Sequence, residues 1–421
     1  MIMREMKDSG ISWVGEIPKE WTIMPLYCFY SERKNKNIFG AENNLLSLSY
    51  GKVIRKDINT SEGLQPSNYN GYNIVEAGDI IIRPTDLQND KRSLRTGLSK
   101  ERGIITSAYI ALKPKNGINS RFYHYLLHTY DILKVFYNMG NGVRQGLNYD
   151  EFAKLMVYSP SDTEQQKIAD FLDRECGKID GLKADIQAQI DTLEQYKRSV
   201  ITEAVTHGLN PSAPMKDSGI NYISEHPIHW SLRRLKYILN ERNERSVTGT
   251  EELLSVSLYK GVIPSTEMTN RTMQADSLIG YKRVHKGDLV FNKLNPGMAR
   301  FGCSDYDGIT SPDFAVYIVN ENYCNAKFLQ YLLKTDFYVE KIKSVSMGVG
   351  DGFTRLYSNQ LYEFFVALPP RDEVSIIINY LDNKCAEIEQ IIADKKSQIE
   401  TLDGYKKSLI YEYVTGKKEV V

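Results

Sequence analysis

The sequence is poor in the residues and patterns that mark a metalloenzyme or a membrane protein. Its five cysteines show no Cys-x-x-Cys spacing and its six histidines are scattered, so neither a disulfide framework nor a zinc site is predicted. No apolar run approaches the length of a membrane span, and the N-terminus lacks the basic-then-apolar pattern of a signal peptide. We therefore expect a cytoplasmic protein that does not contact a membrane.

The motifs of common catalytic sites are also missing. The sequence has no G-x-x-x-x-G-K-[ST] phosphate loop, no G-x-S-x-G elbow and no H-E-x-x-H pair. Its glycine-rich run at Gly140, Gly142 and Gly146 misses the spacing of a dinucleotide fingerprint. These absences predict a chain with no catalytic residues, no metal and no cofactor of its own.

Net charge is absent as well, which leaves the class of binding partner open. The chain carries 53 basic and 53 acidic residues. Residues 1–160 alone hold 21 Lys and Arg against 16 Asp and Glu. This local excess permits nucleic-acid binding by the first part of the chain but does not establish it.

What the sequence does contain is an internal repeat. The hexapeptide Met6–Ile11 returns unchanged as Met215–Ile220, 209 positions later, and each copy is followed by Pro-x-x-Trp. Leu193-Glu-Gln-Tyr-Lys-Arg-Ser returns at the same offset as Leu402-Asp-Gly-Tyr-Lys-Lys-Ser. Between these ends the match is thin, as in Gly71-Tyr72 with Gly280-Tyr281 and Gly78-Asp79 with Gly287-Asp288. Two units that share a scaffold and differ in the middle are expected to perform one kind of task on two different targets.

Each unit is predicted to contain a mixed globular region followed by a long helix. Short β-rich runs at 78–84 and 287–292 alternate with helical stretches at 122–135 and 328–342, which is typical of an α+β domain. We therefore predict two globular regions, 1–160 and 210–369, each followed by a helical segment, 161–209 and 370–421.

The two helical segments carry heptad patterns. Ser161-Asp-Thr-Glu164 fits a capping box and predicts where the first helix begins. Apolar residues then recur every seven positions on two seams in each copy. The predicted seam residues are Ile179, Leu182, Ile186, Leu193, Tyr196 and Val200 in the first helix, and Ile388, Ile391, Leu402, Tyr405 and Leu409 in the second. Ile190, Ile392 and Ile399 widen the apolar stripe, so each helix is expected to pack against more than its partner.

Connectivity predicts the direction of this pairing. The first helix leads from one globular region to the other, and the second begins at the far region, so a pair can form only if the helices run antiparallel. Residues 178–206 would span about 43 Å at 1.5 Å per residue, slightly more than one turn of B-DNA. We therefore expect an intramolecular antiparallel coiled coil that relates the two regions by a pseudo-twofold axis and acts as a ruler.

Several polar residues in loops suit contact with DNA. Arg, Asn and Gln can form bidentate hydrogen bonds with base edges, and Lys and Arg bind phosphates. The candidates are Lys91, Arg92, Arg95, Lys100, Arg102, Arg144, Gln145 and Asn148 in the first region, and Asn292, Lys293, Asn295, Arg300 and Arg355 in the second. For any one of them a solvated turn is the simpler interpretation, and the set as a whole favours nucleic acid.

Two longer motifs resemble a known family. The stretch Lys7-Asp-Ser-Gly-Ile-Ser-Trp-Val-Gly-Glu-Ile-Pro18-x-x-Trp21 is similar to the opening of specificity subunits of type I restriction-modification systems. So is Glu164-Gln-Gln-Lys-Ile-Ala-Asp-Phe-Leu-Asp173, which continues into the heptads up to Gly208. The second copy departs from both motifs, with Asn221-Tyr-Ile-Ser in place of Trp-Val-Gly and Arg371-Asp-Glu-Val in place of Glu-Gln-Gln.

The resemblance implies a DNA sequence-recognition subunit without catalysis. In this family two target recognition domains each read one half of a bipartite double-stranded DNA sequence, and the helices set the spacer. The partners it implies are two modification subunits, which use S-adenosylmethionine and dock on the helices, and two restriction subunits, which use ATP and Mg. Two other readings remain: a coiled-coil scaffold that binds proteins without reading DNA, and a methyltransferase or nuclease fused to a recognition module. The missing motifs weigh against the fusion.

Overall fold

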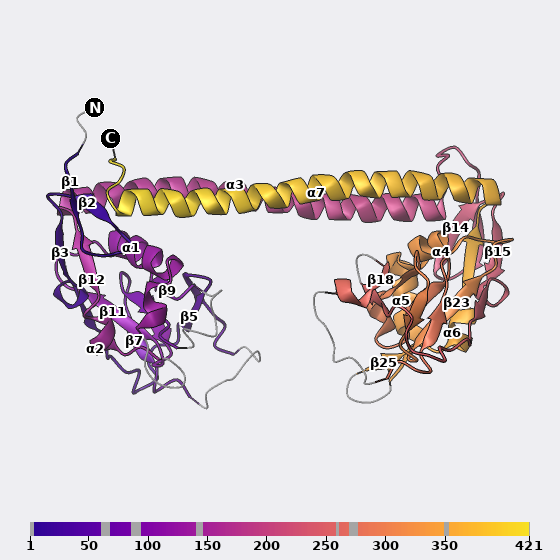
Figure 1. Ribbon diagram of the computed structural model, residues 1–421, viewed down its shortest axis with the longest axis horizontal. Coiled ribbons are helices and arrows are strands. Elements are labelled where there is room, and N and C mark those ends of the chain that lie inside the picture. The colour runs from indigo at the N-terminus through magenta and orange to yellow at the C-terminus, as the bar shows by residue number, and fades with distance from the viewer. Residues whose placement is uncertain are drawn as a thin grey trace. The chain divides into compact units, whose positions relative to one another are not determined.

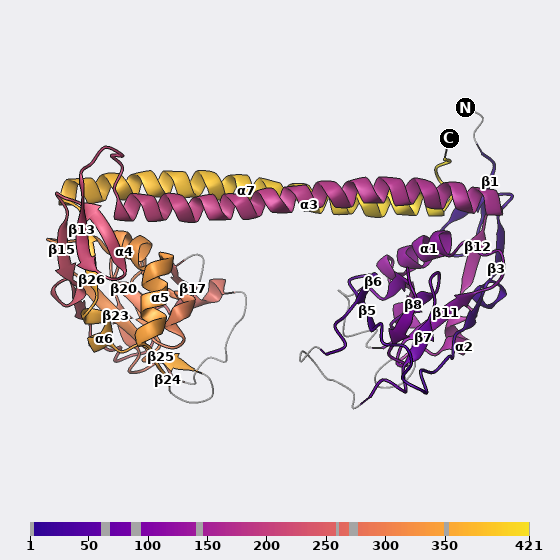
Figure 2. The same cartoon turned by 180° about the vertical axis from the view of Figure 1, so that it is seen from behind.

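The computed structural model describes residues 4–59, 68–85, 94–139, 146–257, 261–268, 277–348 and 353–420. The chain divides into two compact units, which we call unit 1 (residues 1–186 and 397–421) and unit 2 (residues 187–396). Figure 1 and Figure 2 show that each unit combines β-strands with helices and includes parts of two long helices. No helix in the described part of the chain is long and apolar enough to cross a membrane.

Unit 1 is an α+β domain whose strands are short. Its strands are β1 (Met6–Asp8), β2 (Glu16–Pro18), β3 (Thr22–Pro25), β4 (Tyr30–Glu32), β5 (Leu46–Ser49), β6 (Lys52–Arg55), β7 (Asn73–Val75), β8 (Ile80–Ile82), β9 (Thr96–Leu98), β10 (Gly103–Ile105), β11 (Ile110–Pro114) and β12 (Met156–Ser159). Its helices are η1 (Leu26–Cys28), α1 (Ser120–Ile132), η2 (Val135–Asn138), α2 (Tyr149–Phe152) and the start of α3 (Asp162–Thr206).

Unit 2 repeats this order of elements with additions. Its strands are β13 (Met215–Ile220), β14 (Ile223–Pro227), β15 (Ser231–Arg234), β16 (Leu239–Glu241), β17 (Leu254–Ser257), β18 (Gly261–Pro264), β19 (Lys282–Val284), β20 (Leu289–Asn292), β21 (Phe301–Cys303), β22 (Gly308–Thr310), β23 (Phe314–Val319), β24 (Met347–Gly348), β25 (Thr354–Arg355) and β26 (Phe365–Leu368). Its helices are η3 (Leu235–Tyr237), η4 (Ser265–Glu267), η5 (Pro296–Met298), α4 (Ala326–Leu333), α5 (Asp336–Val345), α6 (Ser358–Tyr362) and the start of α7 (Arg371–Val414).

A four-stranded antiparallel sheet forms the centre of each unit. The strand order is β4-β11-β8-β9 in unit 1 and β16-β23-β20-β21 in unit 2. Strand β8 is buried along its whole length because both of its faces are covered. Ile80 and Ile82 join the core that contains α1, whereas Ile81 packs into a separate cluster on the other face. An uninterrupted apolar run is what a strand covered on both faces requires.

The helices on these sheets lie close to their predicted positions, with one difference. The stretch 122–135 is helical as α1 up to Ile132, where Lys134 then adopts a left-handed φ of 61°. The stretch 328–342 is divided into α4 and α5. The break falls at Thr335, whose hydroxyl donates to the carbonyl of Leu332 at 2.7 Å. A Thr that bonds to its own backbone competes with helical hydrogen bonds and favours a helix boundary.

Helix α3 begins at Asp162, directly after the predicted cap. The Ser161 hydroxyl accepts a hydrogen bond from the backbone N–H of Glu164 at 3.3 Å. The Glu164 carboxylate does not complete a capping box, because it accepts from Arg4 at 2.6 Å and from the Trp21 indole at 3.0 Å. The glutamate thus ties the start of the helix to the N-terminal hairpin.

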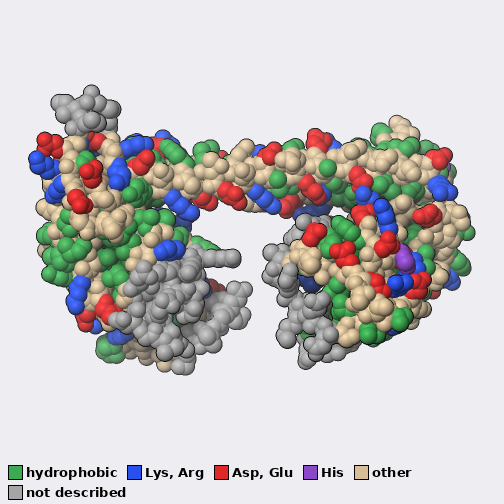
Figure 3. Space-filling model, viewed as in Figure 1, with side chains coloured by type: hydrophobic (Ala, Val, Ile, Leu, Met, Phe, Trp, Pro, Cys, Tyr) green, Lys and Arg blue, Asp and Glu red, His purple; other side chains and the backbone are tan. Residues whose placement is uncertain are grey.

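Helices α3 and α7 pack together in both units, and polar pairs show that they run antiparallel. In unit 1, Lys183 pairs with Asp403 and Lys406 with Asp180, so that the partner moves back along α7 as α3 advances. In unit 2, Lys395 bonds to Gln189 and Lys197 pairs with Glu389, in the same sense. Figure 3 shows acidic and basic side chains beside one another along the two helices.

The first predicted seam lies along the interface of the helix pair. Ile179, Ile388 and Leu409 are 5%, 2% and 6% exposed. Ile186, Leu193, Val200 and Leu402 are half-buried.

The second seam corrects the prediction. Four residues assigned to it are exposed, namely Leu182, Tyr196, Ile391 and Tyr405, at 53%, 49%, 38% and 57%. The less exposed positions come one residue later: Ile190 and Ile392 are buried, and Lys183, Lys197, Ile399 and Lys406 are half-buried. Three of these are lysines, which a search for apolar residues passes over. Their alkyl stems pack along the seam while the ammonium groups meet carboxylates.

Several side-chain contacts occur at corresponding positions of the two units. They are Trp21–Glu164 with Trp230–Glu373, Tyr125–Asp173 with Tyr331–Asp382, and Arg33–Asp79 with Arg242–Asp288. Glu373 keeps the tryptophan contact although its surroundings depart from the Glu-Gln-Gln motif. Cys176 and Cys385, also equivalent, are buried at 5% and 7%, in line with a packing role.

Two histidines of α1 lie one turn apart, with ring centroids separated by 6.0 Å. Burial lowers the pKa of His124 to about 3 and the pKa of His128 to about 4. Nearby cations act in the same direction on each pKa, Lys100 on His124 and Lys406 with Lys407 on His128. Both imidazoles are therefore neutral in the folded protein at neutral pH.

We predict that these histidines make the protein less stable in acid. An unfolded histidine has a pKa near 6.5, so their contribution is fully present above about pH 6.5 and falls as the pH drops toward the folded-state values. His124→Gln with His128→Gln should flatten the change in unfolding free energy between pH 7 and 5 by on the order of 1 kcal/mol per histidine. Thermal unfolding across this range measures the change.

The matched control is Leu133→Gln, which introduces the same side chain at the 42% exposed end of α1 and removes no titratable group. It should leave the pH slope close to that of the wild type. A double variant with the wild-type slope would contradict the assignment to His124 and His128.

Candidate nucleic-acid interface

Four of the five candidates in unit 2 lie together at the end of strand β20. Asn292 ends this strand, and the following segment lies against β25. The Asn295 N–H donates to the Thr354 carbonyl at 2.8 Å, and the Asn295 side chain accepts from the Thr354 N–H at 3.1 Å. The Lys293 carbonyl accepts from Leu356 N–H at 3.0 Å. Arg355 is thereby held beside Lys293 and Asn295, although about 60 residues separate them in the sequence.

The fifth candidate joins the same loop through the backbone. The carbonyl of Arg300 accepts from the N–H of Asn292 at 3.0 Å, and its side chain is exposed. Between them, Asn295 and Ala299 both have positive φ, at 47° and 53°. Such backbone is costly for residues other than glycine and persists only where the surroundings hold it, often at functional sites.

Positive charge is in excess at this place. In the part of unit 2 that the structure describes, the carboxylates of Glu241 and Asp313 lie near Lys282, Lys293 and Arg355. The Lys282 ammonium lies 2.8 Å from a Glu241 oxygen, whereas Arg355 reaches Asp313 only at 3.5 Å. Burial first, and then the charge of Lys282, lower the pKa of Lys293. The local charge suits an anionic ligand.

Arg355 also has an unused donor. Its Nε is buried and finds no acceptor within the described ranges. The guanidinium carbon lies 5.8 Å from the centre of the Tyr357 ring, which limits the directions in which the side chain can point. A buried donor without a partner is costly unless a ligand supplies the acceptor. We call Lys282, Lys293, Asn295 and Arg355 the basic cluster of unit 2.

The candidates of unit 1 are less completely visible. Lys91, Arg92, Arg144 and Gln145 lie outside the described residues. Their assignment as DNA contacts stays a prediction.

The described candidates of unit 1 divide by exposure. Arg95 is fully buried, and its guanidinium donates to the Thr85 carbonyl, which argues against a direct contact with a phosphate. Lys100 is exposed in the turn between β9 and β10. Arg102 is exposed but bridges Glu42 at 3.0 Å and Glu76 at 2.7 Å.

Asn148 serves the local fold. It caps α2: its side-chain oxygen accepts a hydrogen bond from the Glu151 N–H at 2.9 Å. In return, the backbone N–H of Asn148 donates to the Glu151 carboxylate. This complete capping box gives Asn148 a structural reason to be present, whether or not it also meets a ligand.

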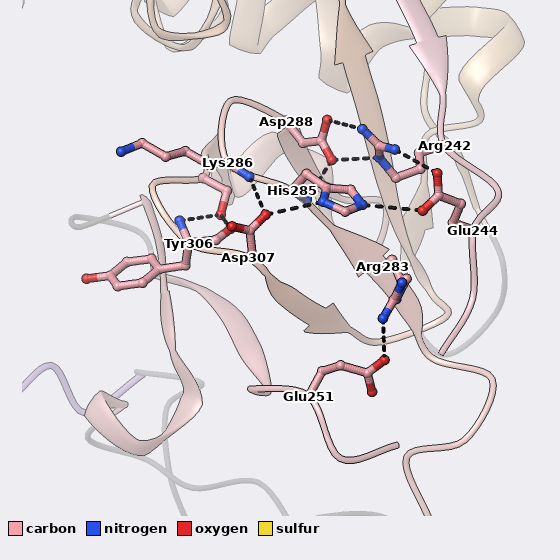
Figure 4. A network of polar contacts seen from close by, with 10 residues as sticks. Arg242, Glu244, Glu251, Arg283, His285, Lys286, Asp288, Tyr306 and Asp307 are labelled. Carbon is pink, nitrogen blue, oxygen red and sulfur yellow. Dashed lines mark hydrogen bonds and ion pairs between the residues drawn. The ribbon is translucent and has the colours of Figure 1, made fainter. Parts of the chain in front are cut away.

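A network of charges around β19 and β20 was not singled out from the sequence (Figure 4). Arg242 binds the Asp288 carboxylate through two nitrogens, at 2.8 and 3.0 Å, and Glu244 at 2.9 Å. His285 lies between Glu244 and Asp307, at 3.3 and 3.2 Å. The repeated Gly-Asp pairs at 78–79 and 287–288 were the available signal for its centre.

This network serves the fold, because its charges satisfy one another. In unit 1, burial raises the pKa of the equivalent Asp79, and the hydrogen bond to Arg33 opposes this rise. Among the described residues no group of three or more His, Cys, Asp or Glu is placed to hold a metal.

An open groove of about 640 Å³ lies elsewhere in unit 2. Its walls include Tyr222, Phe364 and Phe365, with the Lys341 ammonium 5.3 Å from the centre of the Tyr222 ring. None of the predicted DNA contacts lines it. The groove therefore does not contribute to the candidate interface.

Comparison with known proteins finds a family match in part of the chain. Residues 31–192 match the family described as type I restriction modification DNA specificity domain. A search of curated proteins finds no match. A chain solved in work on the complex assembly and conformational transition of the type I R-M system is 12% identical, with a TM-score of 0.66 over 96% of this chain and 99% of that chain. The HsdS subunit from Thermoanaerobacter tengcongensis is also 12% identical, with a TM-score of 0.47 over 96% of this chain and 98% of that chain. At this identity the first structure establishes a shared fold.

Proposed function

The chain belongs to the specificity subunits of type I restriction-modification systems, and we propose that its two units each read one half of a bipartite DNA sequence. The observation that carries this proposal is the basic cluster of unit 2. There Lys293, Asn295 and Arg355 come from distant segments, carry excess positive charge and include an unsatisfied buried donor. Such a site suits a ligand that offers both negative charge and hydrogen-bond acceptors, as duplex DNA does.

The chemistry of these side chains suits both kinds of DNA contact. Lys293 would neutralise a phosphate, which positions a duplex without reading its sequence. Lys282 is 4% exposed and paired with Glu241, so it adds to the local charge without touching the duplex. Arg355 and Asn295 can form paired hydrogen bonds with guanine and adenine edges, which discriminate between bases. Because the framework contacts recur in both units while the loops differ, the two half-sites would differ in sequence.

We further propose that the helix pair sets the spacer between the half-sites. Helix α3 has 45 residues and α7 has 44, which corresponds to roughly 65 Å of helix at 1.5 Å per residue. Cross-helix pairs such as Lys183–Asp403 and Lys197–Glu389 give the pair a defined register. A rod with a fixed register suits a ruler.

One flank of the helix pair suits the docking of modification subunits. The exposed residues each precede a seam residue by one position, which places Leu182 with Tyr405 on one flank of the antiparallel pair in unit 1, and Tyr196 with Ile391 on one flank in unit 2. We call these four the apolar stripe. The opposite flank is already used within unit 1, where Asp173 binds Arg121. Exposed apolar side chains that recur in this way mark an interaction surface.

The chemistry would then lie in the partners. We propose that the chain has no catalysis of its own and assembles with two modification subunits that use S-adenosylmethionine. Two restriction subunits that use ATP and Mg would complete the complex. The proposal is supported by the lack of catalytic motifs in the sequence and by the kind of complex in which the matched structure was studied.

The first prediction tests readout. Arg355→Ala should relax sequence discrimination in one half-site by about 1–3 kcal/mol, the value of a bidentate base contact. Arg144→Ala should do so in the other half-site. Mapping of methylated adenines in DNA exposed to the assembled methyltransferase measures both effects. Arg198→Ala, an exposed arginine of α3 outside the candidate interface, is the control for loss of charge alone. Unchanged preference at every position would rule out Arg355 as a reader.

The second prediction tests docking. Leu182→Glu with Tyr405→Glu should reduce co-purification of the modification subunits at least tenfold, because a charge in a desolvated interface is costly. Thermal stability should change little, since both side chains are exposed. Ala184→Glu, a similar change at an exposed α3 position that follows the seam residue Lys183, should leave co-purification intact. Normal assembly of the double variant would refute the stripe as a docking surface.

The third prediction tests the ruler. A seven-residue insertion after Gln189, matched by one after Gln398, preserves the heptad phase and adds about 10.5 Å of helix. This corresponds to roughly three base pairs, or fewer if the helices are inclined to the DNA. Both half-site sequences should survive while the preferred spacer lengthens. If the inserted protein assembles and methylates DNA with the original spacer, the partner subunits and not the helices set it.

A further inference from the structure

Each unit presents apolar side chains to solvent on one turn, at the same position of the repeat. In unit 1 the turn carries Ile38 and Phe39, which are 64% and 94% exposed. In unit 2 it carries Val247, which is 84% exposed and lies 209 positions after Ile38. Single exposed apolar residues are common on proteins. Recurrence at an equivalent position in both units indicates a shared purpose.

Hydrogen bonds of a buried asparagine hold the turn of unit 1 rigidly. Asn37 is 2% exposed, and its side chain both donates to the Glu42 carbonyl at 2.9 Å and accepts from the Glu42 N–H at 3.1 Å. The Gly40 N–H donates to the Asn37 carbonyl at 2.9 Å, with Gly40 at a φ of 61° that favours glycine. The apolar tip is therefore fixed before any ligand arrives.

The turn of unit 2 is fixed by an equivalent clamp. Ser246 is 3% exposed, donates to the Glu251 carboxylate at 2.5 Å and accepts from the Gly249 N–H at 2.7 Å. Arg283 binds the other oxygen of Glu251 at 3.0 Å, as Figure 4 shows. A Cβ on Gly249 would lie 2.8 Å from the Ile279 nitrogen, so this position requires glycine.

A cation stands next to each apolar tip. The Lys36 ammonium donates to the Gly71 carbonyl at 3.0 Å, and the Arg245 guanidinium donates to the equivalent Gly280 carbonyl at 2.8 Å. Neither has a carboxylate partner within the described ranges. Each therefore keeps its full charge for an external anion.

Both turns continue into the candidate interface of their own unit. In unit 1, Glu42 at the base of the turn binds the candidate Arg102 at 3.0 Å. In unit 2, Arg245 is the β-bridge partner of Lys282, a member of the basic cluster. DNA that contacts either set of candidates would pass close to the turn beside it.

We propose that the two turns are wedges that insert apolar side chains between base pairs of the bound duplex and bend it. The proposal rests on the proposed function, since it requires that the units bind DNA. Proteins that insert rigid apolar side chains beside cations unstack a base step from the minor groove and kink the duplex by roughly 20–90°. Lys36 and Arg245 would bind the phosphates that flank the opened step.

The two wedges differ in size. Unit 1 offers Ile38 and an aromatic ring at Phe39, whereas unit 2 offers Val247 followed by the polar Thr248. The larger wedge unstacks a base step more completely. The half-site read by unit 1 is therefore bent more strongly than the half-site read by unit 2.

The test measures DNA bending by the full-length chain assembled with its modification subunits. A duplex that contains both half-sites, identified by methylation mapping, carries a fluorophore pair at its ends for energy transfer. Ile38→Ala with Phe39→Ala should reduce the bend by about 20° or more and leave the methylated sequence unchanged. Val247→Ala should reduce it by a smaller amount. Tyr27→Ala removes another exposed aromatic of unit 1, 51% exposed, and should leave the bend intact.

The alternative outcomes are distinct. A double variant that bends DNA as the wild type does would overturn the proposal. So would a double variant that loses its modification subunits while the DNA it still binds is bent normally, because the turn would then be a protein contact. A wild-type complex that binds the duplex without bending it would overturn the wedges and leave the proposed function standing. A wild-type complex without sequence-dependent binding would overturn both.

Discussion

The pairing of α3 with α7 is the constraint on which the rest of the structure depends. The core of unit 1 is closed by α3 residues such as Leu172 and by α7 residues such as Leu409 and Val414. The core of unit 2 is closed by Val205 near the end of α3 and Ile377 near the start of α7. Each globular region therefore contains one end of each long helix. Neither region can complete its core unless both helices are in register.

The lysines in the seam strengthen this constraint. A lysine in a partly buried seam is costly without a carboxylate, and the cost is removed only in the register that brings Lys183 to Asp403 or Lys197 to Glu389. Polar residues at seam positions are known to fix register at some expense of stability. In a protein whose helices are proposed to measure a distance, a unique register matters more than the last increment of stability.

The sequence predicted the elements that repeat and missed those that depend on three-dimensional neighbours. The duplicated hexapeptide, the heptads and the start of α3 follow from local patterns. The second seam was placed one residue early, on Leu182 and Tyr196, because periodicity was judged from apolar residues while the interface uses lysine stems. Likewise no pattern in the sequence shows that Thr354 meets Asn295, or that Arg95 is buried against Thr85. Such contacts depend on how loops distant in the sequence come together.

The pairing of polar groups distinguishes the charge network of unit 2 from its basic cluster. The network of Arg242, Asp288 and His285 is closed on itself, since each charge has an opposite charge within hydrogen-bonding distance. The basic cluster is not closed, because the Arg355 Nε has no acceptor among the described residues and Lys293 is partly desolvated beside Lys282 and Arg355. A ligand that supplies the missing acceptors would stabilise this arrangement. Nucleic acid supplies many such acceptors. Lys36 and Arg245 beside the apolar turns could bind its phosphates as well.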